Sequence, residues 1–228
     1  MQRIIVNSFA ALIFFVSIAA AQERGRQSGQ GSHSTVPASR VIEGDYFAFG
    51  EIVEISGTIN GDLYASGGQV VIDGRVNGDV LVGGGRVSLS GTVSQDVRGA
   101  AGHVAITGTI GRNLTVAGGN VEIASSAVVR GGVVAAGGSV DLAAPIDGAA
   151  KIAAGTLIIA NRIGGDVEAV VGTLGIASKA EIGGNVNYWS GQDAAVSEGA
   201  RINGRSSEMS HRKGRGFFRL HCLPGSDL

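Results

Sequence analysis

The sequence has few of the residues that usually hold a small protein together. It contains one cysteine, Cys222, among 228 residues, which excludes an intramolecular disulfide framework and a cysteine-cluster metal site. Aromatic residues make up 5% of the chain, and charged residues make up 16%, against about 25% in typical proteins. The net charge of −1 gives no general attraction to nucleic acid. Glycine is abundant, with 39 copies, so the fold must depend on something other than a large aromatic core, disulfides or a metal.

Residues 1–21 have the features of a secretory signal peptide. Arg3 supplies the positive charge, residues 9–21 form a short apolar stretch, and small residues precede a cleavage site between Ala21 and Gln22. An uncleaved anchor is the alternative, although Asn7 and Ser8 interrupt the apolar run. We therefore expect export to the periplasm or cell envelope. Residues 22–41 are polar and are predicted to be a disordered linker.

An internal repeat of about 17 residues dominates the rest of the chain. Four segments that start at Gly57, Gly74, Gly91 and Gly108 align without gaps, each with an apolar residue two places after the glycine. This opening residue recurs ten times, mostly in steps of 17 or 19. The ten openers are Ile42, Ile59, Val76, Val93, Ile110, Val129, Ile146, Ile163, Ile182 and Ile202. Such self-similarity is typical of a solenoid.

Apolar residues alternate at two places in each unit, four and six residues after the opener and again eleven and thirteen residues after it. Alternation is the signature of strands, and the glycine pairs between these places, such as Gly67 and Gly68, favour sharp turns. Seventeen residues with a double glycine cannot hold two helices. The sequence therefore predicts an all-β fold, a single-stranded parallel β-helix over 42–206, followed by a basic disordered tail over 207–228.

Units of the form G-x-I-x-G-D-L/V followed by G-G-x-V-x-I resemble the bactofilins, bacterial polymer-forming cytoskeletal proteins. The resemblance covers the repeats but neither end of the chain. It implies a right-handed, three-sided β-helix that assembles end to end into filaments without nucleotide. It also implies a scaffold role in cell shape and envelope organisation. Typical members are cytoplasmic, so an exported protein would be a variant of the family.

A column of polar residues lies three places after the openers. Its members are Asp45, Asp62, Asp79, Asp96, Asn113, Asp166 and Asn185. Stacked carboxylates would attract a cation, and calcium prefers oxygen ligands. Calcium-binding β-rolls, however, repeat every nine residues. We expect the Asp and Asn side chains to bond the backbone of their own turns, and we assign no metal and no cofactor.

Enzymatic alternatives find little support in the sequence. Acyltransferases with left-handed β-helices have 18-residue coils and a catalytic base, and His103 is the one histidine within the repeats. No partner for His103 is visible in the sequence, so we expect a solvated corner residue. No P-loop or catalytic triad pattern occurs, and no catalytic residue is assigned. The protein is predicted not to be an enzyme.

The aromatic residues gather near the ends of the repeats. Tyr46, Phe47 and Phe49 lie in the first unit, and Tyr188 and Trp189 lie in the last regular one. Solenoid ends expose unpaired strand edges and apolar surface. These five residues are therefore either caps within one chain or contacts between subunits of a polymer.

The tail adds six basic residues over 201–221 against one acid, Glu208. It could attract a membrane surface or a cell-wall polymer, or it could be simply solvated. The leading hypothesis is a non-enzymatic structural scaffold that self-assembles into a homopolymer by end-to-end stacking. The alternative is a monomeric adhesin or glycan-binding solenoid that uses a side face, and an acyltransferase is more remote.

Overall fold

The computed structural model describes residues 32–208, and all the regular structure in this range is β-strand. The predicted signal sequence with its Ala21–Gln22 cleavage site, residues 22–31 and the tail from residue 209 lie outside the described residues. No helix within 32–208 is long and apolar enough to span a bilayer.

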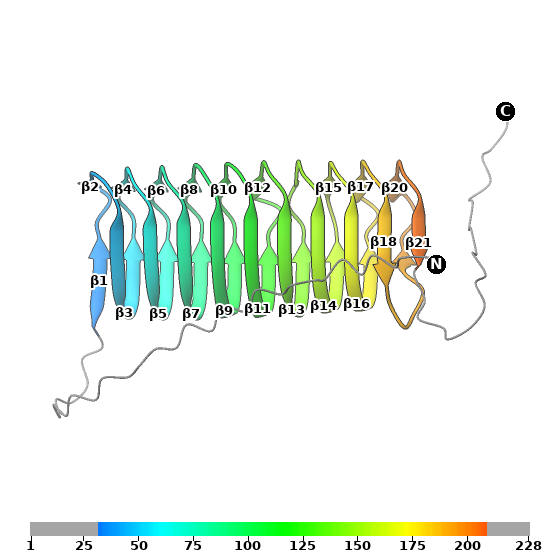
Figure 1. Cartoon of the computed structure of the whole chain (residues 1–228), viewed down its shortest axis with the longest axis horizontal. Helices are drawn as coiled ribbons and strands as arrows, with labels where there is room; N and C mark the ends of the chain where they lie inside the picture. The colour runs from blue at the N-terminus through cyan, green and yellow to red at the C-terminus, as the bar shows by residue number, and fades with distance from the viewer. Residues whose placement is uncertain (1–31, 209–228) are drawn as a thin grey trace, which may run out of the picture. The chain divides into compact units, whose positions relative to one another are not determined.

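Each repeat folds into one coil of a parallel β-solenoid, which confirms the predicted fold class (Figure 1). Long strands pair in parallel with the same place in the next repeat, for example Leu63 with Val80 and Val80 with Val97. The eight long strands have ten residues each. They are β3 (Tyr46–Ile55), β5 (Leu63–Ile72), β7 (Val80–Leu89), β9 (Val97–Ile106), β11 (Leu114–Ile123), β13 (Val133–Leu142), β14 (Ala150–Ile159) and β16 (Val167–Ile176).

The opening residues form a second ladder of short strands. These are β2 (Val41–Ile42), β4 (Thr58–Ile59), β6 (Arg75–Val76), β8 (Thr92–Val93), β10 (Thr109–Ile110), β12 (Val128–Val129), β15 (Arg162–Ile163), β17 (Glu181–Ile182) and β20 (Arg201–Ile202). Ile146 joins β12 to β15 through single bridges to Val129 and Ile163. The ladder of openers is therefore continuous from the first coil to the last.

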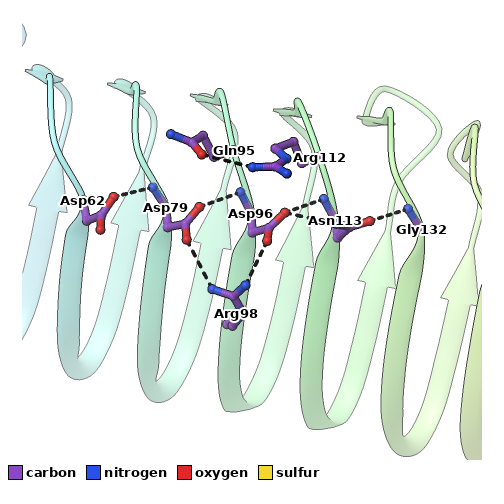
Figure 2. A network of polar contacts seen from close by, with 8 residues as sticks. All are labelled: Asp62, Asp79, Gln95, Asp96, Arg98, Arg112, Asn113 and Gly132. Atoms are coloured by element: carbon purple, nitrogen blue, oxygen red, sulfur yellow. Dashed lines mark hydrogen bonds and ion pairs between the residues drawn. The ribbon is translucent and has the colours of Figure 1, made fainter.

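Each long strand bends into a U with two arms (Figure 2). In β5 the first arm is 63–67 and the second arm is 69–72, and pairing with β7 skips only the residue between them. The sequence predicted two separate strands with turn glycines between them. One bent strand forms instead, because a single unpaired residue is enough to redirect the chain.

The core is a thin apolar column along the solenoid. No polar or charged side chain is buried within the described residues. Fully buried side chains such as Ile55, Ile59 and Leu63 come from the second arm, the opener and the first arm in turn. Burying each such side chain contributes about 1.5–3 kcal/mol, and every coil obtains this burial from the coils on either side.

Close approach between coils explains the glycines better than turn conformation does. Only Gly44 and Gly199 among the described glycines have a positive φ, 101° and 95°. By contrast, a Cβ on Gly91 would overlap the carbonyl oxygen of Gly74 in the preceding coil. The glycines do lie at the corners and bends of the coils, as expected, but at most of them the close spacing between coils, and not a positive φ, is what excludes a side chain.

The solenoid begins earlier than the sequence predicted. Strand β1 (His33–Val36) lies inside the predicted linker and pairs with the second arm of β3, from Ile52 to Ile55. Val36 is fully buried, which explains why this polar stretch is ordered: one apolar side chain on an in-register strand covers the first coil. At the other end, β21 (Ser206–Glu208) extends the solenoid two residues past the predicted boundary.

Two glycine substitutions test the close approach of the coils. Gly91→Ala should lower the free energy of unfolding by about 1–3 kcal/mol, since neither backbone can move without disturbing its own ladder. Gly83→Ala is the matched control, because the nearest atom to its added Cβ is 3.8 Å away. Urea unfolding should show little change for Gly83→Ala. Equal effects of the two substitutions would contradict the packing argument.

Candidate functional site

The outward column of Asp and Asn residues forms a ladder that joins the coils. Each side chain accepts a hydrogen bond from the backbone N–H at the same place in the next coil, as Asp62 does from Asp79 at 2.8 Å (Figure 2). Seven such contacts measure between 2.7 and 3.0 Å. The sequence analysis expected these side chains to bond their own turns, and that was wrong. In a solenoid, the nearest free N–H belongs to the next coil.

Arg98 shows how a cation binds this ladder. Its guanidinium donates to Asp96 at 2.8 Å and to Asp79 at 3.3 Å, bridging two coils (Figure 2). The pKa of Asp96 is lowered chiefly by the hydrogen bond from the Asn113 backbone, with help from the Asn113 side chain and from Arg98. One carboxylate can therefore bind a backbone N–H through one oxygen and an arginine through the other.

The ladder is interrupted where Gly132 and Ala149 replace the acidic residue. Gly132 and Ala149 have no side-chain oxygen that could accept a hydrogen bond from the N–H groups of Ala149 and Asp166 in the next coil. Near this interruption a shallow groove lies on the surface between Arg98 and Lys151. Both cations beside this groove already have acidic partners. Arg98 pairs with Asp79 and Asp96, and the Lys151 ammonium lies 3.1 Å from the Glu168 carboxylate. Within 32–208 no three or more His, Cys, Asp and Glu residues cluster as metal ligands.

His103 has a neighbour that the sequence did not reveal. Its Nδ1 lies 3.1 Å from the side-chain nitrogen of Asn120, which occupies the same place in the next coil. The imidazole is half-buried on the second arm of β9, rather than fully solvated as expected. From the sequence alone, this contact could have been predicted only by comparing residues that are 17 positions apart.

The N-terminal end of the solenoid carries an open strand edge. Strand β1 covers the second arm of β3, whereas the first arm, 46–50, has a paired strand only on the β5 side within the described residues. Tyr46 is half-buried against the core, while Phe47 and Phe49 are 59% and 65% exposed. This arm has no charge and no proline, the usual protections of an exposed edge.

The side face next to this edge combines aromatic rings with carboxylates. Phe47 stacks on Tyr64 with ring centroids 4.7 Å apart, and Leu81 follows in the next coil, 52% exposed. Each of these three residues lies two places after a ladder aspartate. We call the six residues the acidic–aromatic patch: Asp45, Phe47, Asp62, Tyr64, Asp79 and Leu81. The pKa of the Tyr64 hydroxyl is raised by partial burial and then by the carboxylates of Asp62 and Asp45.

The C-terminal end is built from shorter pieces. Strand β18 (Val186–Trp189) forms only a first arm, and β19 (Ala195–Val196) pairs with the end of β16. Tyr188 points inward and is 6% exposed, with its hydroxyl 3.4 Å from the Ala194 N–H, whereas Trp189 is half-buried. The five aromatic residues singled out from the sequence thus lie at two opposite ends, three at one and two at the other (Figure 1).

Comparison with family models, with curated proteins and with solved structures found no match. The likeness to bactofilins therefore rests on the repeat pattern alone.

Acid titration should reveal the charged part of the ladder. Because the pKa of Asp96 is lowered in the folded protein, its ionisation stabilises the fold above the unfolded pKa, and this stability is lost as pH falls below about 4. Asp96→Asn keeps the acceptor oxygen, as Asn113 does naturally at 3.0 Å from the Gly132 N–H. The variant should lose less stability than the wild type between about pH 5 and about pH 2 in urea titrations. An unchanged pH profile would contradict the assignment.

Proposed function

We propose that this protein is a non-enzymatic structural scaffold whose solenoids stack end to end, head to tail, into a homopolymer. The observation that supports this proposal is that its two ends are complementary partial coils. Within residues 32–208 the first arm of β3 has no partner on its outer edge, and the C-terminal end presents β21, which occupies that place in the repeat.

Head-to-tail stacking would extend the ladder of openers and the ladders of both strand arms into the next copy, with the same spacing as between coils of one chain. Ile202 would pair with Ile42 of the next copy, Ser206 with Tyr46, and Val196 with Val36, because each pair occupies the same place in the repeat. Within the chain, the N–H at the start of each first arm donates to the next coil, as Tyr46 does to the Asp62 carbonyl at 2.8 Å. Ser206 would donate to the Asp45 carbonyl of the next copy in the same way.

Stacking would also bury apolar surface that one chain leaves partly exposed. Val196 is 50% exposed, and the openers of the first and last coils, Ile42 and Ile202, are only half-buried, whereas the openers between them are buried. A solenoid coil obtains its core from its neighbours, so the end coils are the ones that gain from a second copy.

The proposal also includes the cellular location of the scaffold, and this part of it rests on the sequence. The predicted signal peptide supports export, and the bactofilin-like repeats support a scaffold in the bacterial cell envelope. A second candidate, a monomer that binds a glycan or another envelope polymer through a side face, is favoured by the exposed rings of Phe47 and Phe49. Binding of purified cell wall by a strictly monomeric protein would favour this second candidate over the scaffold.

Two proline variants test both assembly and its polarity. N–H groups alternate between strand edges, so the Phe49 N–H faces the open edge at one end and the Ser206 N–H faces it at the other. Phe49→Pro and Ser206→Pro remove these donors and block the edges without breaking a bond inside the chain. Each variant alone should be monomeric in sedimentation velocity, and a 1:1 mixture should form dimers through the two intact ends.

The control is Phe49→Ser, which removes the ring, keeps the N–H and should still assemble. Circular dichroism would verify that both proline variants keep the β-fold. Dimers of Ser206→Pro alone would indicate head-to-head contact, and unhindered assembly of both folded variants would remove the strand edges from the interface.

A further inference from the structure

The acidic–aromatic patch has unmatched charge as well as exposed apolar surface. Asp45 and Asp62 each accept a backbone N–H with one carboxylate oxygen, and neither has an ion-pair partner within 32–208. Residues 41–85 contain seven acidic residues and one arginine, a net charge of −6. The surface therefore fits a ligand that brings both cations and apolar side chains.

Arg98 provides a template for that ligand within the protein itself. It stands in the coil directly after Leu81, two places after a ladder aspartate, and bridges Asp79 and Asp96 at 3.3 and 2.8 Å. Asp45 and Asp62 are stacked in the same way, but the corresponding places hold Phe47 and Tyr64. An arginine supplied from outside could bridge them while an aromatic ring packs on the exposed Phe47 or Leu81.

The chain contains one segment with this chemistry. Residues 212–219 read RKGRGFFR, and the stretch 209–221 has four cations and no acidic residue. The other polar segment, residues 22–31, contains no apolar side chain that could cover the rings.

Chain length decides which copy this segment can reach. The openers Ile202 and Val76 are seven coil steps apart, so Leu81 lies roughly 34 Å along the axis from Glu208 of its own chain. Gly216 is eight residues past Glu208 and can extend at most about 29 Å. In a head-to-tail stack the patch of the next copy begins one coil step away, about 5 Å, which is well within reach.

We propose that residues 212–219 of one copy dock on the acidic–aromatic patch of the next copy and strap the junction between two solenoids. The inference rests on the proposed head-to-tail assembly, because stacking is what brings this segment beside the patch.

Cysteine cross-linking in the purified full chain tests the strap. In a Cys222→Ser background, Gly216→Cys is combined with Leu81→Cys in the patch. The control combines Gly216→Cys with Val134→Cys, which lies in the same outward column and is 47% exposed, against 52% for Leu81. Val134 lies only four coil steps, roughly 19 Å, from Glu208 of its own chain, so a freely moving tail would reach it more easily.

The Leu81 pair should give a ladder of covalent oligomers on a non-reducing gel, and the Val134 pair should give little product. Arg212→Glu with Arg215→Glu should lower the oligomer yield about tenfold, equivalent to about 1.4 kcal/mol. Asp45→Asn with Asp62→Asn should act in the same direction while keeping the backbone acceptors. Salt at about 0.5 M should weaken the cross-link, because the charges are exposed.

Sedimentation of the reduced protein separates failure of the strap from failure of stacking. Assembly without a Leu81 ladder, or with equal cross-linking of Val134, would overturn the strap and leave the stacking proposal in place. Absence of both assembly and ladder would overturn both. A Leu81 ladder in a protein that does not assemble when reduced would support the docking contact and contradict stacking as its cause.

Discussion

In-register stacking of one coil on the next is the constraint on which the rest of this structure depends. A coil of about 17 residues has no interior of its own, and its apolar side chains become buried only when a neighbouring coil covers them. The backbone bonds of the long strands, the opener ladder and the Asp–Asn ladder all run in this one direction. In the part of the chain that the structure describes, every interior coil is therefore complete, and the two end coils are not.

Because of this stacking, residues at the same place in successive repeats form a column along the solenoid. Each member of a column has the same neighbours and so meets the same physical requirement. Gly57, Gly74, Gly91 and Gly108 hold a column where a side chain would meet a carbonyl group. Departures from a column then mark places where the surface changes. Arg98 ends the acidic–aromatic patch, and Gln95 and Arg112 replace glycines next to the ladder and bond each other at 3.3 Å (Figure 2). Gly132 and Ala149 interrupt the ladder itself.

The columns also explain how much of this protein could be predicted from its sequence. Periodicity located the openers and the inward residues, and hence the solenoid, because burial repeats with the coil. It did not locate β1, since a single buried residue, Val36, has no repeat to reveal it. It misassigned the partners of the aspartates, and it missed the contact of His103 with Asn120, because both contacts join residues 17 apart. The aromatic ends were found by composition, but Tyr64 and Leu81 emerged as part of a patch only when the outward columns were aligned in space.

The measurement that tests the central claim most directly is cryo-electron microscopy of the purified protein under assembling conditions. Continuous stacking predicts polar rods with an unbroken axial spacing of about 4.8 Å and a subunit repeat of ten coils, roughly 48 Å. Single particles the length of one solenoid, or rods in which adjacent subunits point in opposite directions, would contradict it.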